Sequence, residues 1–216
     1  LVFKDHNTMV NNCAIIIQDF LGRMQKERAE KGEEFTPVQV FGGITLNDSV
    51  GGMNVRAVKT ALDYGRCKEV WLPSLDAAHQ KEAMGLSGGI RVSDCKGTLT
   101  QEMMDVLAVL AEYNDNTKGE RVVLSACHVS NEEKFDILRY IKKKDMDVKV
   151  LMDHVTQEMT ILTPDEAKEM IDLGGYLEFA ECSCVPWPGM QDWIIAFDYS
   201  FNLIKELIKE KGPEHL

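Results

Sequence analysis

Three histidines follow short apolar runs of the kind that form buried strands, and they are His6, His128 and His154. His128 and His154 occupy the same place in two successive strand-helix units. A single histidine of this kind is more often an ordinary polar residue bonded to the backbone, but three at equivalent positions favour a site. Neutral imidazoles on a rigid rim are good ligands for zinc or a similar divalent ion. We therefore predict His128 and His154 as ligands of a divalent metal, with zinc as the first choice and manganese or iron as alternatives.

Carboxylates near the same strand ends are the next candidates. Glu178 ends a predicted strand and is interpreted as a metal ligand, an orienting group or a general base, with a salt bridge at the rim as the alternative. We predict that His6 or Glu178 assists proton transfer. Asp76 is interpreted as a loop cap. Asp5 and Asp153 each precede a candidate histidine, and on extended backbone their side chains would point away from it, which favours a supporting role.

The elements that position these side chains alternate along the whole chain. Short β-branched runs followed by helical patterns predict strand-helix units with a parallel sheet buried on both faces. Strands are predicted near residues 1–4, 38–46, 69–72, 121–126, 148–152 and 176–179. Helices are predicted near residues 12–31, 54–64, 100–113, 131–144, 164–173 and 191–211.

Capping residues support two of these predicted helices, and a glycine-rich stretch interrupts the alternation of strands and helices. Ser130 with Glu133 predicts a capping box, and Thr163 is followed by a proline at the first helical position. The glycine-rich stretch 76–99 is interpreted as a loop or hairpin insertion with a small strand at Ile90–Val92. Residues 1–216 are otherwise predicted to form a single domain.

Six strand-helix units favour a TIM-like (β/α)8 barrel that is incomplete at both ends. The eight units of such a barrel usually occupy about 250 residues. The 216 residues of the chain are therefore short by roughly one or two units. The apolar start at Leu1 and the lone Leu216 after a helix end suggest interior cuts. An open doubly wound sheet is the rival fold, but no glycine-rich phosphate fingerprint follows the first predicted strand.

The charge and composition of the chain limit the classes of partner that it is expected to bind. With 35 acidic against 24 basic side chains, the net charge of −11 disfavours nucleic acid. No apolar run approaches the length of about 20 residues that spans a bilayer, so no membrane partner is expected. Six scattered cysteines favour reduced thiols and a cytoplasmic protein. A small-molecule substrate is expected, and a homo-oligomer is only a weak default.

The remaining histidines and aromatic residues carry less signal. His79 and His215 are expected at the surface. Trp187, Met190 and Trp193 lie near the last predicted strand and are candidates for lining a substrate pocket.

Several segments together resemble an uncharacterised family within the amidohydrolase-like, metal-dependent hydrolase superfamily. The segments are Lys4–His6, Phe41–Asn47, Val50–Asn54, Val70–Pro73 and Leu124–Ser130. The resemblance implies a distorted TIM barrel with a divalent metal centre, in which His128 and His154 are the fifth- and sixth-strand ligands. It places a His-x-His pair before Leu1 and an aspartate after Leu216. The strand that carries a metal-bridging lysine in many relatives ends here in Trp71-Leu72-Pro73, which disfavours a lysine-bridged pair of metals.

Three functions follow as hypotheses. The first is hydrolysis of an amide, ester or phosphoester bond by metal-activated water. The second is a Schiff-base lyase that uses Lys4. The third is a non-catalytic, degenerate barrel that binds a small ligand, because a fold alone does not specify a function.

Overall fold

The computed structural model describes residues 1–117, 121–181, 184 and 197–216, and in them the chain is a mixed α/β protein. The strands are β1 (Gly42–Thr45), β2 (Cys67–Trp71), β3 (Val123–Ser125), β4 (Lys149–Met152) and β5 (Tyr176–Leu177). The helices are α1 (Asn11–Glu30), α2 (Val55–Tyr64), α3 (Ala78–Ala83), α4 (Gln101–Asn116), α5 (Asn131–Lys144), α6 (Pro164–Asp172) and α7 (Phe197–Lys211), with a 3-10 turn η1 (Asp48–Val50). None of these helices combines the length and apolar character needed to cross a bilayer.

The five strands form one parallel sheet whose order follows the sequence, β1-β2-β3-β4-β5. Val2 forms a parallel bridge with Phe41, so the N-terminal run lies beside the start of β1 and extends the same order. No pairing among the described residues joins β5 back to this run. The predicted α/β class with a parallel sheet is confirmed, and the described strands form an open sheet.

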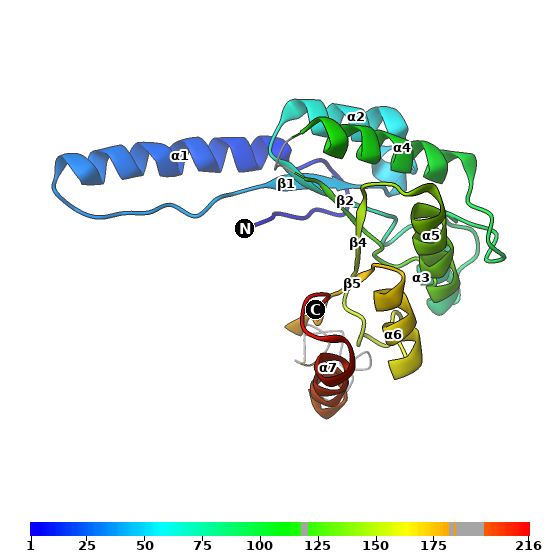
Figure 1. Ribbon diagram of the computed structural model, residues 1–216. Helices are drawn as coiled ribbons and strands as arrows, with labels where there is room; N and C mark the ends of the chain where they lie inside the picture. The colour runs from blue at the N-terminus through cyan, green and yellow to red at the C-terminus, as the bar shows by residue number, and fades with distance from the viewer. Residues whose placement is uncertain (118–120, 182–183, 185–196) are drawn as a thin grey trace.

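One face of the sheet packs against helices. Successive side chains of a strand point to opposite faces, and one set joins a single hydrophobic core with α2, α4, α5, α6 and α7. The strand residues in that core include Ile44, Val70, Leu124 and Val150. Figure 1 shows α2, α4, α5 and α6 along this side of the sheet. The helices of the core lie on one face, whereas a doubly wound sheet carries helices on both faces, so the described fold differs from that rival.

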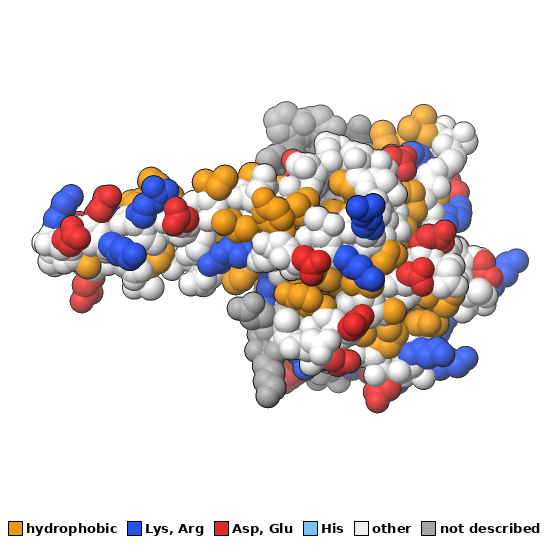
Figure 2. Space-filling view, turned by 90° about the horizontal axis from the view of Figure 1, so that it is seen from above, with side chains coloured by type: hydrophobic (Ala, Val, Ile, Leu, Met, Phe, Trp, Pro, Cys, Tyr) orange, Lys and Arg blue, Asp and Glu red, His pale blue; other side chains and the backbone are white. Residues whose placement is uncertain are grey.

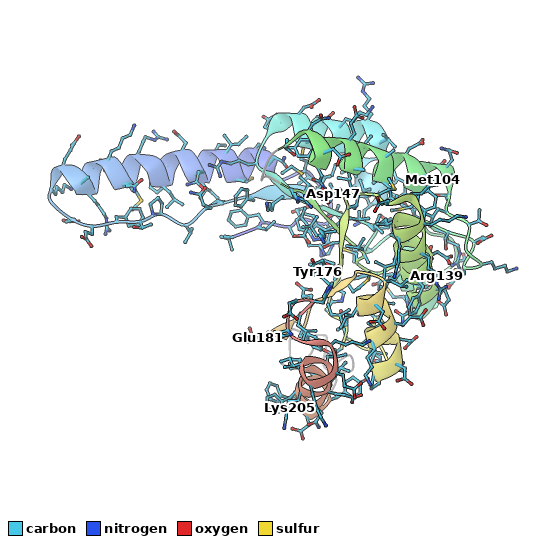
Figure 3. All side chains as sticks on the ribbon, viewed as in Figure 1. Met104, Arg139, Asp147, Tyr176, Glu181 and Lys205 are labelled. Carbon is cyan, nitrogen blue, oxygen red and sulfur yellow. The ribbon has the colours of Figure 1, made fainter. Side chains whose placement is uncertain are left out.

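The opposite face carries a more polar set of side chains. The registered neighbours Thr45, Trp71, Ser125, Leu151 and Tyr176 lie on it. Tyr176, labelled in Figure 3, marks the outer end of the sheet at β5. In a barrel this face would form the interior.

The predicted helix ends agree with the structure within a few residues. Both predicted caps are present, since Ser130 and Glu133 bond each other's backbone reciprocally and Thr163 and Glu166 do the same at α6. The predicted start of the last helix at residue 191 lies outside the described residues, and the described part of that helix begins at Phe197. The strand predicted over residues 38–46 is shorter, because only Gly42–Thr45 pairs as a strand.

The stretch 76–99 contains a helix that was not predicted. The six-residue α3 has no side-chain cap at Ala77, so the sequence offers no start signal. The small strand expected at Ile90–Val92 reduces to one bridge between Ile90 and Ala77, and a second bridge joins Ser93 to Leu99. The predicted loop or hairpin is therefore found only in the second half of this stretch, where it is a loop with a minimal hairpin.

Helix α1 and the extended return over residues 31–40 form an arm that projects from the body (Figure 1). Its root is fixed to α2. The Asn11 side-chain amide donates to Ala61 O at 2.7 Å and to Gly65 O at 2.9 Å. We call residues 11–40 the arm.

Candidate functional site

His128 and His154 meet at the carboxyl edge of the sheet. Their Nε2 atoms are 3.2 Å apart and their ring centroids 5.0 Å apart. The backbone bends sharply at both strand ends, because Cys127 has φ 46° and His154 has φ 37°. Non-glycine residues rarely adopt such angles, and they concentrate at functional sites. Equivalent positions in two successive units are thus brought together in this pair.

The partners of the two Nδ1 atoms set the tautomers. His128 Nδ1 lies 2.6 Å from Gln80 Oε1, an amide oxygen that can only accept, so Nδ1 carries the proton. His154 Nδ1 lies 3.1 Å from Thr160 Oγ1, whose own hydroxyl donates to His154 O at 2.8 Å. Thr160 therefore also accepts from the ring. Both Nε2 atoms are left with lone pairs that face each other.

Two facing lone pairs at this distance repel unless a cation lies between them. A proton is disfavoured, because burial, together with smaller contributions that include the charge of Lys4, lowers the pKa of His128 to about 2 and that of His154 to about 4. Two nitrogens bound to one tetrahedral zinc ion are about 3.3 Å apart at the usual bond length. The pair therefore fits two positions of such a site. Within the described residues, no group of three His, Cys, Asp or Glu side chains forms a full ligand set.

Two carboxylates fix the loops that carry the histidines. Asp153 is 3% exposed, and its Oδ2 accepts the Cys127 N–H at 2.6 Å. Glu178 Oε2 accepts the His154 N–H at 3.0 Å, and burial followed by the charge of Asp153 raises the pKa of Glu178. Each carboxylate thus comes from one strand end and holds the backbone at the preceding one. Asp153 acts on the backbone and not on a histidine ring.

Lys4 also lies at the carboxyl edge of the sheet, and its side chain is a protonated ammonium group. Its Nζ is 3.1 Å from Cys127 Sγ, 3.9 Å from Asp153 Oδ1 and 5.4 Å from the centre of the Trp71 ring. Burial lowers the pKa of Lys4, but the acidic groups around it, Cys127, Asp153 and Glu69, outweigh burial and raise the pKa above its usual value. A Schiff-base nucleophile needs a neutral amine, so this environment disfavours that chemistry.

His6 belongs to a neighbouring hydrogen-bond cluster. Its Nδ1 lies 2.8 Å from Ser74 Oγ. The buried Asn47 amide donates to His6 O at 2.8 Å and to Ser74 Oγ at 2.9 Å, and its oxygen accepts the Ser74 N–H. Burial, then the charge of Lys4, lowers the pKa of His6. No hydrogen bond joins His6 to His128 or His154 among the described residues, but His6 is one of the charges that lower the pKa of His128.

Glu69 is a site residue that the sequence analysis missed. It accepts a hydrogen bond from the Ser125 hydroxyl on the open face of the sheet. Burial raises its pKa to about 7, and the charges of Asp153 and Glu178 act in the same direction. The available signal was an acidic residue two positions before Trp71, on the strand face opposite the core. Gln80 and Thr160 were also missed, because their role depends on loop paths that no spacing rule specifies.

The other predicted positions have mixed outcomes. Asp76 accepts the Asp48 N–H at 2.9 Å and pairs with Lys81 at 3.0 Å, which confirms a loop-capping role. His79 and His215 are partly exposed, and each has a partner. His79 Nε2 lies 2.9 Å from Met159 O, and His215 stacks on Tyr176 with ring centroids 4.7 Å apart. The proposed pocket residues Trp187, Met190 and Trp193 lie outside the described residues.

These features define a parallel α/β protein with a paired-imidazole site at the carboxyl edge of its sheet. The chain belongs to a family of unknown function (DUF6282), whose model matches residues 1–178. The matched stretch contains β1 to β5, both histidines of the pair and Glu178. No curated protein and no solved structure matches the chain.

Proposed function

We propose that the chain is a metal-dependent hydrolase of the amidohydrolase-like type, with His128 and His154 as two ligands of a divalent metal. The single observation that carries this proposal is the approach of the two Nε2 atoms to 3.2 Å, with each Nδ1 beside its own hydrogen-bond partner. Metal-bound histidines ordinarily have their second ring nitrogen fixed in this way. Zinc is the first choice, and manganese or iron the alternatives.

The fold supports the same proposal. In TIM-type barrels the active site lies at the carboxyl ends of the strands, where both histidines lie here. Strands that follow the sequence order, with helices on one face, are the arrangement of consecutive units in such a barrel. We therefore propose that the open sheet corresponds to part of a TIM-like barrel.

The chain's own residues divide the remaining work. A divalent ion held at this edge would activate water for attack on an amide, ester or phosphoester bond. Glu69, with its pKa raised to about 7, is suited to take up and return a proton near neutral pH. Glu178 holds the His154 backbone, so it acts chiefly as a positioning residue. The Lys4 ammonium, 27% exposed, supplies positive charge for a developing oxyanion on a small-molecule substrate.

The test measures metal before activity. The intact protein is loaded with zinc, manganese or iron, freed of excess ion, and its metal content determined by mass spectrometry. We expect a stoichiometric ion in the wild type and its loss in His128→Ala and His154→Ala. His215→Ala is the matched control, since it removes a half-buried histidine at the β5 end of the sheet and should leave the metal content unchanged. Hydrolysis of a panel of amide, ester and phosphoester substrates follows on the loaded forms.

A ligand-binding protein without catalysis is the second candidate. It is favoured by one observation, the lack of a third metal ligand beside the pair in the described part of the chain. If the wild type binds no metal above the level of His128→Ala, the hydrolase proposal fails and this candidate replaces it.

A further inference from the structure

The arm carries apolar side chains that no described part of the chain covers. Of the 20 residues of α1, only Asn11 and Ala14 at its root are buried. Ile16 and Phe20 are 65% and 55% exposed. A helix in a globular protein gains most of its stability by burying an apolar stripe. In Figure 3 the side chains of α1 stand out from the arm with no second element above them.

The exposed stripe has the spacing of a helix-pairing seam. Cys13, Ile17, Phe20 and Met24 follow one another at intervals of four, three and four residues, with Ile16 beside them. Each is exposed or half-exposed. Alternating intervals of three and four residues are typical of helices that pack side by side. We call these five residues the α1 stripe.

The arm is held in shape by its own chain. Gln18 Oε1 accepts the Val40 N–H at 2.8 Å and lies 3.2 Å from Arg66 Nη1. The Arg28 guanidinium lies 5.0 Å from the centre of the Phe35 ring. These contacts fix the return segment along α1, so a partner does not have to order the arm before binding it.

Charge indicates which partner the arm suits. Residues 11–40 contain four basic and five acidic side chains, whereas the whole chain carries −11. Almost all of the excess negative charge therefore lies on the body, and Figure 2 shows basic and acidic side chains interspersed along the arm with apolar ones between them. A nucleic acid or an anionic membrane would need a basic surface. A second copy of the acidic chain is repelled by the body, and the arm is where it can approach.

We propose that two copies of the chain pair arm to arm, with the α1 stripe of one packed against the α1 stripe of the other across a two-fold axis. The same patch then serves both partners, as two-fold symmetry requires. The arm lies apart from the strand-end site, so this inference is independent of the proposed function.

Sedimentation velocity of the full chain over a wide concentration range tests the pairing. We expect a dimer in the wild type and a dissociation constant at least about tenfold higher in Ile16→Glu and in Phe20→Glu. Leu86→Glu is the control, since Leu86 is 56% exposed but lies off the arm, and it should leave the dimer intact. Circular dichroism verifies that each variant keeps its helices. Added salt should tighten the dimer, because it screens the repulsion between the two acidic bodies.

Hydrogen exchange places the interface without any substitution. Amides of α1 in the wild type should exchange faster as the protein is diluted, in step with dissociation. A monomer at every concentration overturns the proposal. So does a dimer that dissociates on dilution without faster exchange of the α1 amides, or one that Leu86→Glu weakens as much as Phe20→Glu.

Discussion

The strand-end site and the arm are built in opposite ways. At the site, polar side chains bond across neighbouring strands, as Asp153 does to Cys127 and Glu178 to His154. Along the outer part of the arm, contacts such as that of Arg28 with Phe35 are made within the arm, and Ile16 and Phe20 are exposed. The chain therefore stabilises its site internally, whereas the stripe of the arm would be buried only by the proposed pairing. Substitutions at the two regions should differ in kind as well as in size.

The largest effect is expected at Asp153. Asp153→Ala removes the acceptor of the buried Cys127 N–H and one charge partner of Lys4, so both groups lose their compensation. We expect the free energy of unfolding to fall by about 2–4 kcal/mol in urea denaturation. The matched control is Asp19→Ala in the arm, where an exposed pair with Arg23 at 2.9 Å should cost no more than about 0.5 kcal/mol. Equal losses would refute the contrast between the two regions.

Glu69 should make the stability of the site region depend on pH. Its pKa is raised to about 7 in the fold, so the folded state holds the proton more tightly than the unfolded chain. The stability is therefore greatest at acid pH and is lost as the pH rises from the ordinary glutamate value through about 7. Glu69→Gln removes this loss while keeping an acceptor for Ser125. We expect it to raise the free energy of unfolding by up to about 2 kcal/mol near pH 8 and to change it little near pH 5.

Thermal unfolding across this pH range measures the effect. The exposed arm residue Glu30, changed to Gln, is the control and should show no such trend. A pH-independent difference between Glu69→Gln and the wild type would contradict the assignment.

Thr160 and Thr156 offer a matched pair in the loop after β4. Both are fully buried, but Thr160 Oγ1 bonds the ring and carbonyl of His154, whereas Thr156 Oγ1 has no hydrogen-bond partner within the described structure. Thr160→Val should weaken metal binding about tenfold, since the tautomer of His154 is no longer fixed. Thr156→Val should leave metal affinity unchanged and raise stability slightly. Titration of each variant with zinc against a competing chelator measures both affinities, and equal affinities would refute the tautomer argument.

The smallest effect on the folded monomer is expected in the arm. Ile16→Ser exchanges an exposed side chain that touches little, so the free energy of unfolding of the monomer should change by less than about 0.5 kcal/mol. Denaturation at high dilution measures this value. A loss comparable to that of Asp153→Ala would mean that the stripe is covered within one chain, which would remove the contrast.

The sequence predicted the parts of the site that depend on topology. His128 and His154 end successive parallel strands, and the carboxyl ends of such strands meet at one edge, so their approach follows from order alone. The helices with capping boxes, α5 and α6, were predicted for a similar reason, because Ser130 and Thr163 bond backbone groups only three residues away.

The rest depends on contacts distant in sequence. Gln80 reaches His128 from α3, a helix with no cap to announce it, over 48 residues of sequence. Glu69 is an ordinary acidic residue until the fold buries it beside Ser125. The periodicity near residues 12–31 predicted a helix but not its projection from the body, because nothing local specifies which face a helix leaves uncovered.

The bonds between neighbouring strand ends also have a consequence for how the chain is made. Because each strand pairs with the next one in the sequence, the sheet can grow in the order in which the ribosome releases it. The acceptor for the Cys127 amide arrives only with β4, and the acceptor for the His154 amide only with β5. In a nascent chain stalled before Glu178, both histidines would already be present, but the His154 N–H would lack its acceptor. The loops of this edge are therefore held in place only after β5 has emerged.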